Sequence, residues 1–181
     1  MIQILAILNC RTAIPTNSTD SINSTGWSPW KKTASCSSGC IRGSMGFYTL
    51  ERNCLNDSLS CSGFNSDVRL CKDTKICEKE GRKRIAAFEF ASERCLNFSS
   101  KVDAIDGTAG GSQKDHEPDR VWVGCTVFCR NKDSESFYTP RIQLNKLGID
   151  PYFPDGTWCH KDTEGQNYFC RKHHCLPADF R

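Results

Sequence analysis

The chain has 181 residues, of which 13 are cysteine, and its 24 Lys and Arg against 21 Asp and Glu leave a net charge of +3. So much cysteine beside only 38% hydrophobic residues argues against a reduced cytosolic enzyme and indicates a thin core held by disulfides. No apolar run reaches the ~18 residues of a membrane-spanning helix, and this small net charge does not by itself indicate nucleic acid binding.

The amino-terminal segment, residues 1–26, combines an apolar stretch with a polar linker. Residues 2–10 are about as long as the apolar part of a secretory signal peptide, but no basic residue precedes them and Arg11 lies close to a cleavage site after Ala13. Two interpretations stay open: a signal peptide, or a truncated gene model whose first residues belong to a missing upstream domain. Residues 14–26 are rich in Ser, Thr and Asn, which predicts a flexible, glycosylated linker.

Cysteine parity and N-glycosylation sequons indicate secretion. Cys10 lies apart from the other cysteines, and without it twelve remain, an even number that allows complete pairing. A single sequon is weak evidence, but several in one cysteine-rich chain predict a secreted glycoprotein. The expected acceptors are Asn17, Asn23, Asn56 and Asn97.

Residues 27–77 form the first cysteine module, which opens W-S-P-W and continues after five residues with C-S-S-G-C and four more cysteines. Residues 27–84 carry eleven Lys and Arg against six Asp and Glu, whereas residues 85–181 sum to −2. This asymmetry makes a polyanion a candidate partner, the alternative being a solvated basic face. The candidate contacts are Lys31, Lys32, Arg82, Lys83 and Arg84.

The first module resembles a thrombospondin type 1 repeat along its whole length. Trp27 and Trp30 fit the opening W-x-x-W, and Arg52 and Arg69 each lie two residues before a cysteine, where that family places its stacking arginines. A further arginine of the family's pattern is Leu50 here, so one layer is missing. The resemblance implies an elongated three-stranded antiparallel ribbon with guanidinium groups stacked on indole rings, and C-mannosylation of Trp27. The disulfides it implies are Cys36–Cys71, Cys40–Cys77 and Cys54–Cys61.

Residues 78–87 are interpreted as a basic linker and residues 88–181 as a second cysteine module. There F-A-S-E-R-C is followed by C-T-V-F-C, P-D-G-T-W-C and two closing cysteines. This looks like the first part of the cysteine-rich domain of ADAMTS proteins, the disintegrin-like metalloproteases with thrombospondin motifs. The disulfides that this resemblance implies are Cys95–Cys129, Cys125–Cys170 and Cys159–Cys175.

Local patterns predict a small mixed α/β domain for the second module. Residues 86–98 lack Gly and Pro and predict a short helix, whereas residues 121–129 and 137–144 alternate or are β-branched and predict strands. Residues 99–119 contain three glycines and predict an exposed loop. The expected fold class is therefore small and disulfide-rich, an elongated three-stranded repeat followed by a small mixed α/β domain.

The sequence offers no catalytic or metal site. A zinc metalloprotease needs H-E-x-x-H, and none of the four histidines begins that motif. Cysteine and histidine cluster between residues 159 and 175, but a secreted domain oxidises its thiols, so zinc is not expected there. His173 and His174 are interpreted as surface residues of a loop. We expect neither enzyme activity nor a cofactor for this chain.

The order of the two modules is typical of ADAMTS and ADAMTS-like proteins, and the resemblance covers about residues 27–178. It implies a secreted, non-catalytic adaptor of the extracellular matrix that binds matrix proteins and, through its basic residues, heparan sulfate-type glycosaminoglycans. The alternative is the substrate-recognising exosite region of an ADAMTS zinc metalloendopeptidase whose catalytic domain is missing from this chain. A small secreted toxin or inhibitor fits the cysteine density but not the module order. Neither nucleic acid nor membrane insertion is expected.

Overall fold

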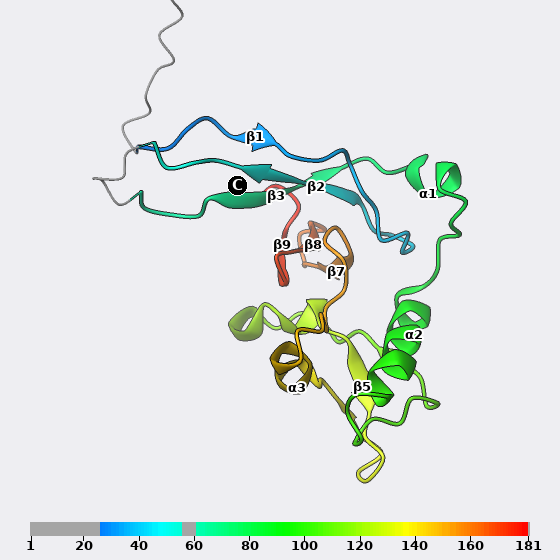
Figure 1. Ribbon diagram of the computed structural model, residues 1–181. Coiled ribbons are helices and arrows are strands. Elements are labelled where there is room, and N and C mark those ends of the chain that lie inside the picture. Colours follow the sequence, from blue (N-terminus) through cyan, green and yellow to red (C-terminus); the bar gives the residue numbers. More distant parts are fainter. Residues whose placement is uncertain (1–25, 56–60, 181) are drawn as a thin grey trace, which may run out of the picture.

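The computed structural model describes residues 26–55 and 61–180 of the chain. This part is a small disulfide-rich fold with three small antiparallel sheets and few helices, as expected at this coarse level (Figure 1). The elements in chain order are β1 (Lys31–Lys32), β2 (Gly46–Glu51), β3 (Ser66–Cys71), α1 (Ile76–Lys79), α2 (Ala87–Ser99), β4 (Gly111–Ser112), η1 (Pro118–Arg120), η2 (Val123–Cys125), β5 (Phe128–Arg130), β6 (Phe137–Tyr138), α3 (Arg141–Lys146), β7 (Trp158–Lys161), β8 (Asn167–Arg171) and β9 (His174–Pro177).

Strands β1, β2 and β3 form an elongated sheet that crosses the top of Figure 1. β2 pairs with β3 along its whole length, with Tyr48 opposite Arg69. The sheet is too thin to bury much, and Gly46 and Val68 are the buried residues of its strands. The two longer disulfide loops, of 35 and 37 residues, therefore matter, because each is worth roughly 3–4 kcal/mol in the chain-entropy account. We call residues 26–77 the first unit and residues 86–180 the second unit. The disulfides of the first unit are Cys36–Cys71 and Cys40–Cys77 at one end of the sheet and Cys54–Cys61 at the other.

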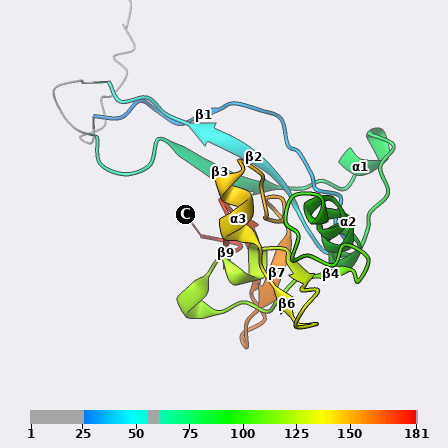
Figure 2. The ribbon, with the colours of Figure 1, turned by 60° about the horizontal axis from the view of Figure 1, so that its bottom comes forward.

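The main core lies in the second unit, on one face of α2. Ala91, Cys95 and Phe98 are spaced by four and three residues, so they share a helix face, and all three are buried. The backbone N–H of Ala86 donates to the Glu89 carboxylate over 2.6 Å, which satisfies a donor at the start of the helix. The disulfide Cys95–Cys129 ties this face to β5, and Figure 2 shows α2 beside β4.

The third sheet, β7-β8-β9, lies between the first sheet and the rest of the second unit (Figure 1). Strands β8 and β9 are joined by Lys172 and His173, whose φ angles of 47° and 70° suit the type I′ turn favoured by two-residue hairpins. This sheet encloses a second, smaller core made of cysteines. The disulfides of that core are Cys125–Cys170 and Cys159–Cys175.

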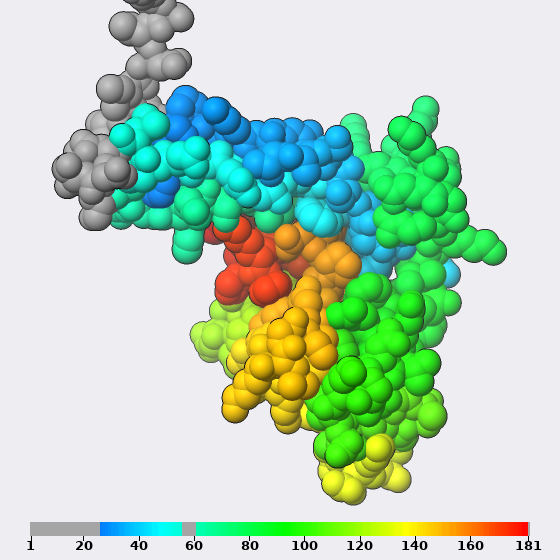
Figure 3. Space-filling model, in the orientation of Figure 1, coloured from blue at the N-terminus to red at the C-terminus, as the bar shows by residue number. Residues whose placement is uncertain are grey.

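The two units pack tightly against each other. The side chain of Ile41, from the first unit, is 1% exposed and belongs to the core around Phe98 and Phe153. The backbone N–H of Met45 donates to the carbonyl of Gly156 over 2.9 Å, and Figure 3 shows the carboxyl-terminal residues directly against the first sheet. The segment expected to be a linker takes part as well, since Ile85 pairs with Ile41 in a parallel β-bridge.

Three local expectations for the second unit differ in outcome. The helix expected at 86–98 is confirmed as α2, shifted by one residue at each end. The strand expected at 137–144 is wrong beyond Tyr138, because Pro140 is followed by helix α3. The expected strand at 121–129 begins instead with the 3₁₀ turn η2. The segment 99–119 is not an exposed loop throughout, since Val102 and Ile105 are buried in the core.

The helices of the described residues are short, and the longest of them is α2 with 13 residues. None of them is both long and apolar enough to cross a membrane.

Candidate binding surface

A ladder of stacked side chains runs along the first sheet. The Arg52 guanidinium carbon lies 4.4 Å from the ring centroid of Trp27 and 4.3 Å from that of Trp30. The Arg52 Nε donates to the carbonyl of Phe64 over 2.9 Å, and the Trp27 Nε1 donates to the carbonyl of Ser62 over 2.8 Å. Each cation–π contact stabilises the sheet by about 0.5–2 kcal/mol. The ladder therefore takes over part of the role of a core.

The two tryptophans of the ladder differ in exposure. Trp27 is 6% exposed, whereas Trp30 is 39% exposed. Trp27 is also the residue expected to accept C-mannose, and a ring this buried is accessible to an enzyme only before the unit folds.

The second arginine expected in the ladder is not stacked on an indole ring. Arg69 instead pairs with Asp67 over 2.8 Å and donates to the carbonyl of Phe180 over 3.4 Å. Another pair extends the ladder: the Lys32 Nζ lies 4.3 Å above the ring of Tyr48. Sequence analysis missed Tyr48, although residues 48 and 50 of β2 and residue 52, directly after the strand, follow the two-residue spacing that places side chains on one face of an extended chain.

The five cations expected to bind a polyanion do not form one group. Arg82 pairs with Glu80 over 2.5 Å and donates to the carbonyl of Ser38 over 2.7 Å. Arg84 pairs with the buried carboxylate of Asp73 over 2.9 Å. Both arginines thus have an acidic partner within the fold, and their contact with a polyanion stays a prediction. The three lysines of the set are exposed and have no ion pair within the described residues: Lys31, Lys32 and Lys83.

The Arg84 pair belongs to a buried polar cluster. The Ser38 hydroxyl donates to Asp73 over 2.5 Å, on the other carboxylate oxygen. Burial would raise the pKa of the Asp73 carboxyl, but the hydrogen bonds from Arg84 and Ser38 outweigh it and hold the pKa below its ordinary value. Arg84 is therefore a structural residue that anchors the segment between the two units.

A cleft of about 570 Å³ opens where the first sheet meets the β8–β9 hairpin, and we call it the junction cleft. Its walls are largely apolar, and its polar lining is mostly basic. The first unit contributes Trp30, Arg52, Phe64, Ser66, Asp67 and Arg69. The second unit contributes Val121, Arg171, Lys172, His174, Leu176 and Phe180.

Arg171 is the most buried cation of the junction cleft, at 5% exposure. Its guanidinium donates to two carbonyls, that of Phe180 over 2.8 Å and that of Pro177. Its Nε is buried and has no hydrogen-bond partner within the described residues. Burial lowers the pKa of this guanidinium, although the nearby carboxylates of Asp67, Asp179 and Asp155 oppose the shift.

The sequence did not point to this cleft. Phe64 and Arg171 are more than 100 residues apart, and Arg171 lies in an R-K-H-H run that is typical of a solvated turn. His173, expected on the surface of a loop, is exposed in the β8–β9 turn and stacks on Tyr152 with ring centroids 3.8 Å apart.

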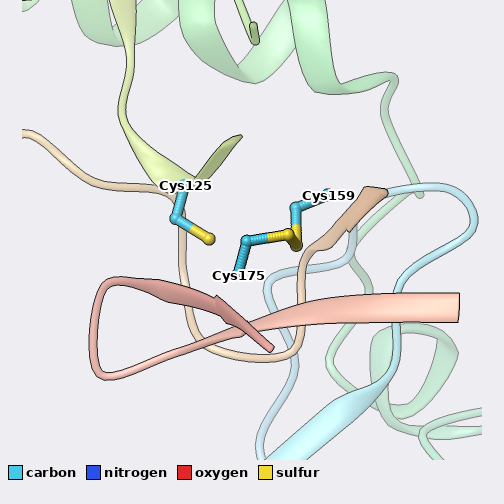
Figure 4. A group of neighbouring side chains, drawn as sticks. All are labelled: Cys125, Cys159 and Cys175. Carbon is cyan, nitrogen blue, oxygen red and sulfur yellow. A yellow bond between two sulfur atoms is a disulfide. The ribbon is translucent and has the colours of Figure 1, made fainter. Parts of the chain in front are cut away.

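Three cysteines of the second unit bring their sulfur atoms within 4.8 Å of one another: Cys125, Cys159 and Cys175 (Figure 4). Each sulfur is already bonded, Cys125 to Cys170 and Cys159 to Cys175. A disulfide sulfur has no thiolate charge to give to zinc, so this cluster is a pair of structural staples.

The six disulfides of the described residues join the same cysteine pairs that the two resemblances imply. Asn97, one of the expected glycosylation acceptors, lies exposed on α2. Cys10 and the remaining expected acceptors lie outside the described residues: Asn17, Asn23 and Asn56.

No protein-family model matches the chain, and no curated protein matches it either. Its function is therefore inferred from its own residues.

Proposed function

We propose that this chain is a secreted, non-catalytic binding protein of the extracellular matrix, of ADAMTS-like type. In this proposal residues 27–77 are a thrombospondin type 1 repeat and residues 88–181 are the first part of an ADAMTS-type cysteine-rich domain. The oxidised state of the twelve cysteines from Cys36 to Cys175 supports secretion, because such bonds persist only in an oxidising compartment.

The observation that carries the proposal is the ladder on the first sheet. Arg52 lies between Trp27 and Trp30, and Lys32 covers Tyr48, on a narrow sheet clamped at both ends by disulfides. Side chains held in this way lose little conformational entropy when a partner binds. A rigid row of aromatic rings and cations is suited to recognition, which is the role proposed here.

Polyanion binding is the part of this role that the exposed lysines support. Lys31 and Lys32 lie on β1, and Lys83 follows α1, so the two groups are separated along the sheet (Figure 1). Contacts between exposed charges are screened within about 8 Å at physiological salt. We therefore expect weak, salt-sensitive binding of heparin-like glycans rather than a tight site.

Heparin chromatography of the full chain tests this role. The wild-type chain should be retained at ~50 mM salt, where screening is weak, and should elute at moderate salt. Neutralising the three lysines together, as Lys31→Gln, Lys32→Gln and Lys83→Gln, should lower the salt concentration of elution. A matched control with the same number of charges removed, Lys101→Gln, Lys146→Gln and Lys161→Gln on the second unit, should leave it unchanged. A wild-type chain that passes through unretained would remove polyanion binding from the proposal.

A further inference from the structure

The junction cleft combines an undercompensated buried cation with exposed aromatic walls. We propose that it binds an acidic peptide segment of a partner protein, in which a carboxylate side chain lies next to an apolar one. This inference rests on the proposed function only in that a matrix-binding protein needs a protein partner. It states where the protein partner would bind, in the junction cleft, and which side chains it would present, a carboxylate next to an apolar group.

Arg171 supplies the first reason for a carboxylate. A buried guanidinium without a directly paired carboxylate is costly, and Arg171 forms no ion pair within the described residues, although the carboxylates of Asp67 and Asp179 lie near it. Its two hydrogen bonds go to neutral carbonyls, and its Nε remains without a partner. A carboxylate in the cleft would compensate this charge, and charge-assisted hydrogen bonds to Arg are roughly twice as strong as neutral ones.

The rest of the cleft adds to the positive potential. Its lining carries four cations against the single carboxylate of Asp67, and Arg69 already pairs with that carboxylate over 2.8 Å. The Lys172 ammonium donates to the Ser66 hydroxyl over 2.7 Å, which fixes its charge at the mouth without neutralising it. An anion is therefore the charge that complements this surface.

The apolar walls favour a peptide over a sulfated glycan. Phe64 is 79% exposed and Phe180 is 51% exposed, and both rings line the cleft together with Leu176. A glycan with charge on every sugar would leave these rings in water, whereas an apolar side chain next to a carboxylate would cover them. The volume of about 570 Å³ also falls within the roughly 300–1,000 Å³ typical of ligand sites.

The cleft is preformed, because its two walls are fixed relative to each other. The Lys172 ammonium on the hairpin reaches Ser66 on the first sheet, and Arg69 reaches the carbonyl of Phe180. These bonds join the first unit to the second unit, whose core also contains Ile41 of the first unit. A binding site that needs no rearrangement loses less free energy on association.

The test uses the full, disulfide-intact chain and a pair of blocked peptides. The probe is acetyl-Glu-Phe-Glu-Leu-Glu-amide, and its control is the same peptide with every glutamate replaced by glutamine. In calorimetric titrations we expect the glutamate peptide to bind at least tenfold more tightly. Equal affinities for the two peptides would overturn the proposal.

Variants of the cleft locate the binding. Lys172→Gln and Phe64→Ser change exposed side chains of the cleft, and each should weaken binding of the glutamate peptide about fivefold or more while the chain still shows one cooperative melting transition. Lys161→Gln, on β7, is the matched control and should bind as the wild type does. Unchanged affinity in both cleft variants would contradict the proposal.

Heparin separates this inference from the proposed function. A heparin tetrasaccharide should not displace the peptide, and displacement that Lys172→Gln abolishes would make the cleft a glycan site instead. A chain that is retained on heparin but binds no peptide would contradict the peptide site in the junction cleft and leave the proposed function standing. A chain that binds the peptide but neither heparin nor matrix would contradict the proposed function and leave the peptide site standing.

Discussion

Two arginines in equivalent sequence positions have different roles in this protein. Arg52 and Arg69 each precede a cysteine by two residues, yet Arg52 lies between two indole rings and Arg69 pairs with Asp67. The neighbouring side chain determines what each arginine does. Trp27 and Trp30 hold a single guanidinium group between them, that of Arg52. The sequence could identify the tryptophans and arginines but not which of them would meet.

The stacked arginine should matter for stability. Arg52→Ala removes two cation–π contacts and should lower the free energy of unfolding by about 1–3 kcal/mol, measured by chemical denaturation of the oxidised chain. Arg42→Ala is the matched control. Its ion pair with Glu89 is exposed and should contribute less than about 1 kcal/mol. Equal losses in the two variants would show that the ladder adds no stability of its own.

The Asp73 cluster gives the protein a defined response to acid. Because the pKa of Asp73 is lower in the folded protein than its ordinary value of 3.8, its contribution to stability is present above that value. The contribution is lost as the pH falls through the lowered pKa. Asp73→Asn should cost roughly 1–3 kcal/mol at neutral pH, since it leaves buried partners unpaired.

Thermal melts between pH 7 and pH 2 check this response. The melting temperature of Asp73→Asn should fall less steeply than that of the wild type below about pH 4. Asp103→Asn replaces an exposed carboxylate and should follow the wild-type curve. Parallel curves for Asp73→Asn and wild type would contradict the assigned role.

At the scale of elements, prediction succeeded where a local pattern was sufficient. Residues 86–98 carry their own helical pattern, and α2 forms there. The pattern of residues 137–144 favoured a strand, but Pro140 fixes the backbone and α3 follows it. The junction cleft could not be predicted at all, because its walls come from β3 and the β8–β9 hairpin, which only the packing of the two units brings together.

The contact between the units depends on a glycine. Gly156 has a φ of +81°, and a Cβ at that position would lie 2.3 Å from the backbone oxygen of Met45. Gly156→Ala should therefore cost roughly 2–5 kcal/mol through backbone strain and overpacking. It should also increase the rate of proteolysis between residues 78 and 85, where the chain passes from one unit to the other.

Gly148 provides the control for that prediction. Its φ is +70°, but a Cβ there would meet nothing within 4 Å, so Gly148→Ala adds the backbone strain alone, about 1–2 kcal/mol. The difference between the two variants measures the close approach of the units. No difference would mean that Met45 moves away freely and that the junction is loose.

At the scale of the whole molecule, disulfides stabilise each unit and non-covalent contacts hold the two units together. The first sheet has almost no interior, and the second unit has a small core into which Ile41 of the first unit inserts. Three disulfides hold each unit, and no disulfide joins the two units within the described residues. The relative position of the two units therefore depends on non-covalent packing. The junction cleft depends on the same packing, because both units line it.

Binding of the purified, oxidised chain to cell-free extracellular matrix tests the central claim most directly. The account predicts saturable binding that decreases at high salt, together with an intact matrix afterwards, both with and without added zinc. Arg52→Ala should weaken the binding, because in this account the ladder is part of the binding surface, whereas Arg42→Ala should not. Absence of saturable binding, or cleavage of a matrix protein that a chelator abolishes, would contradict the account.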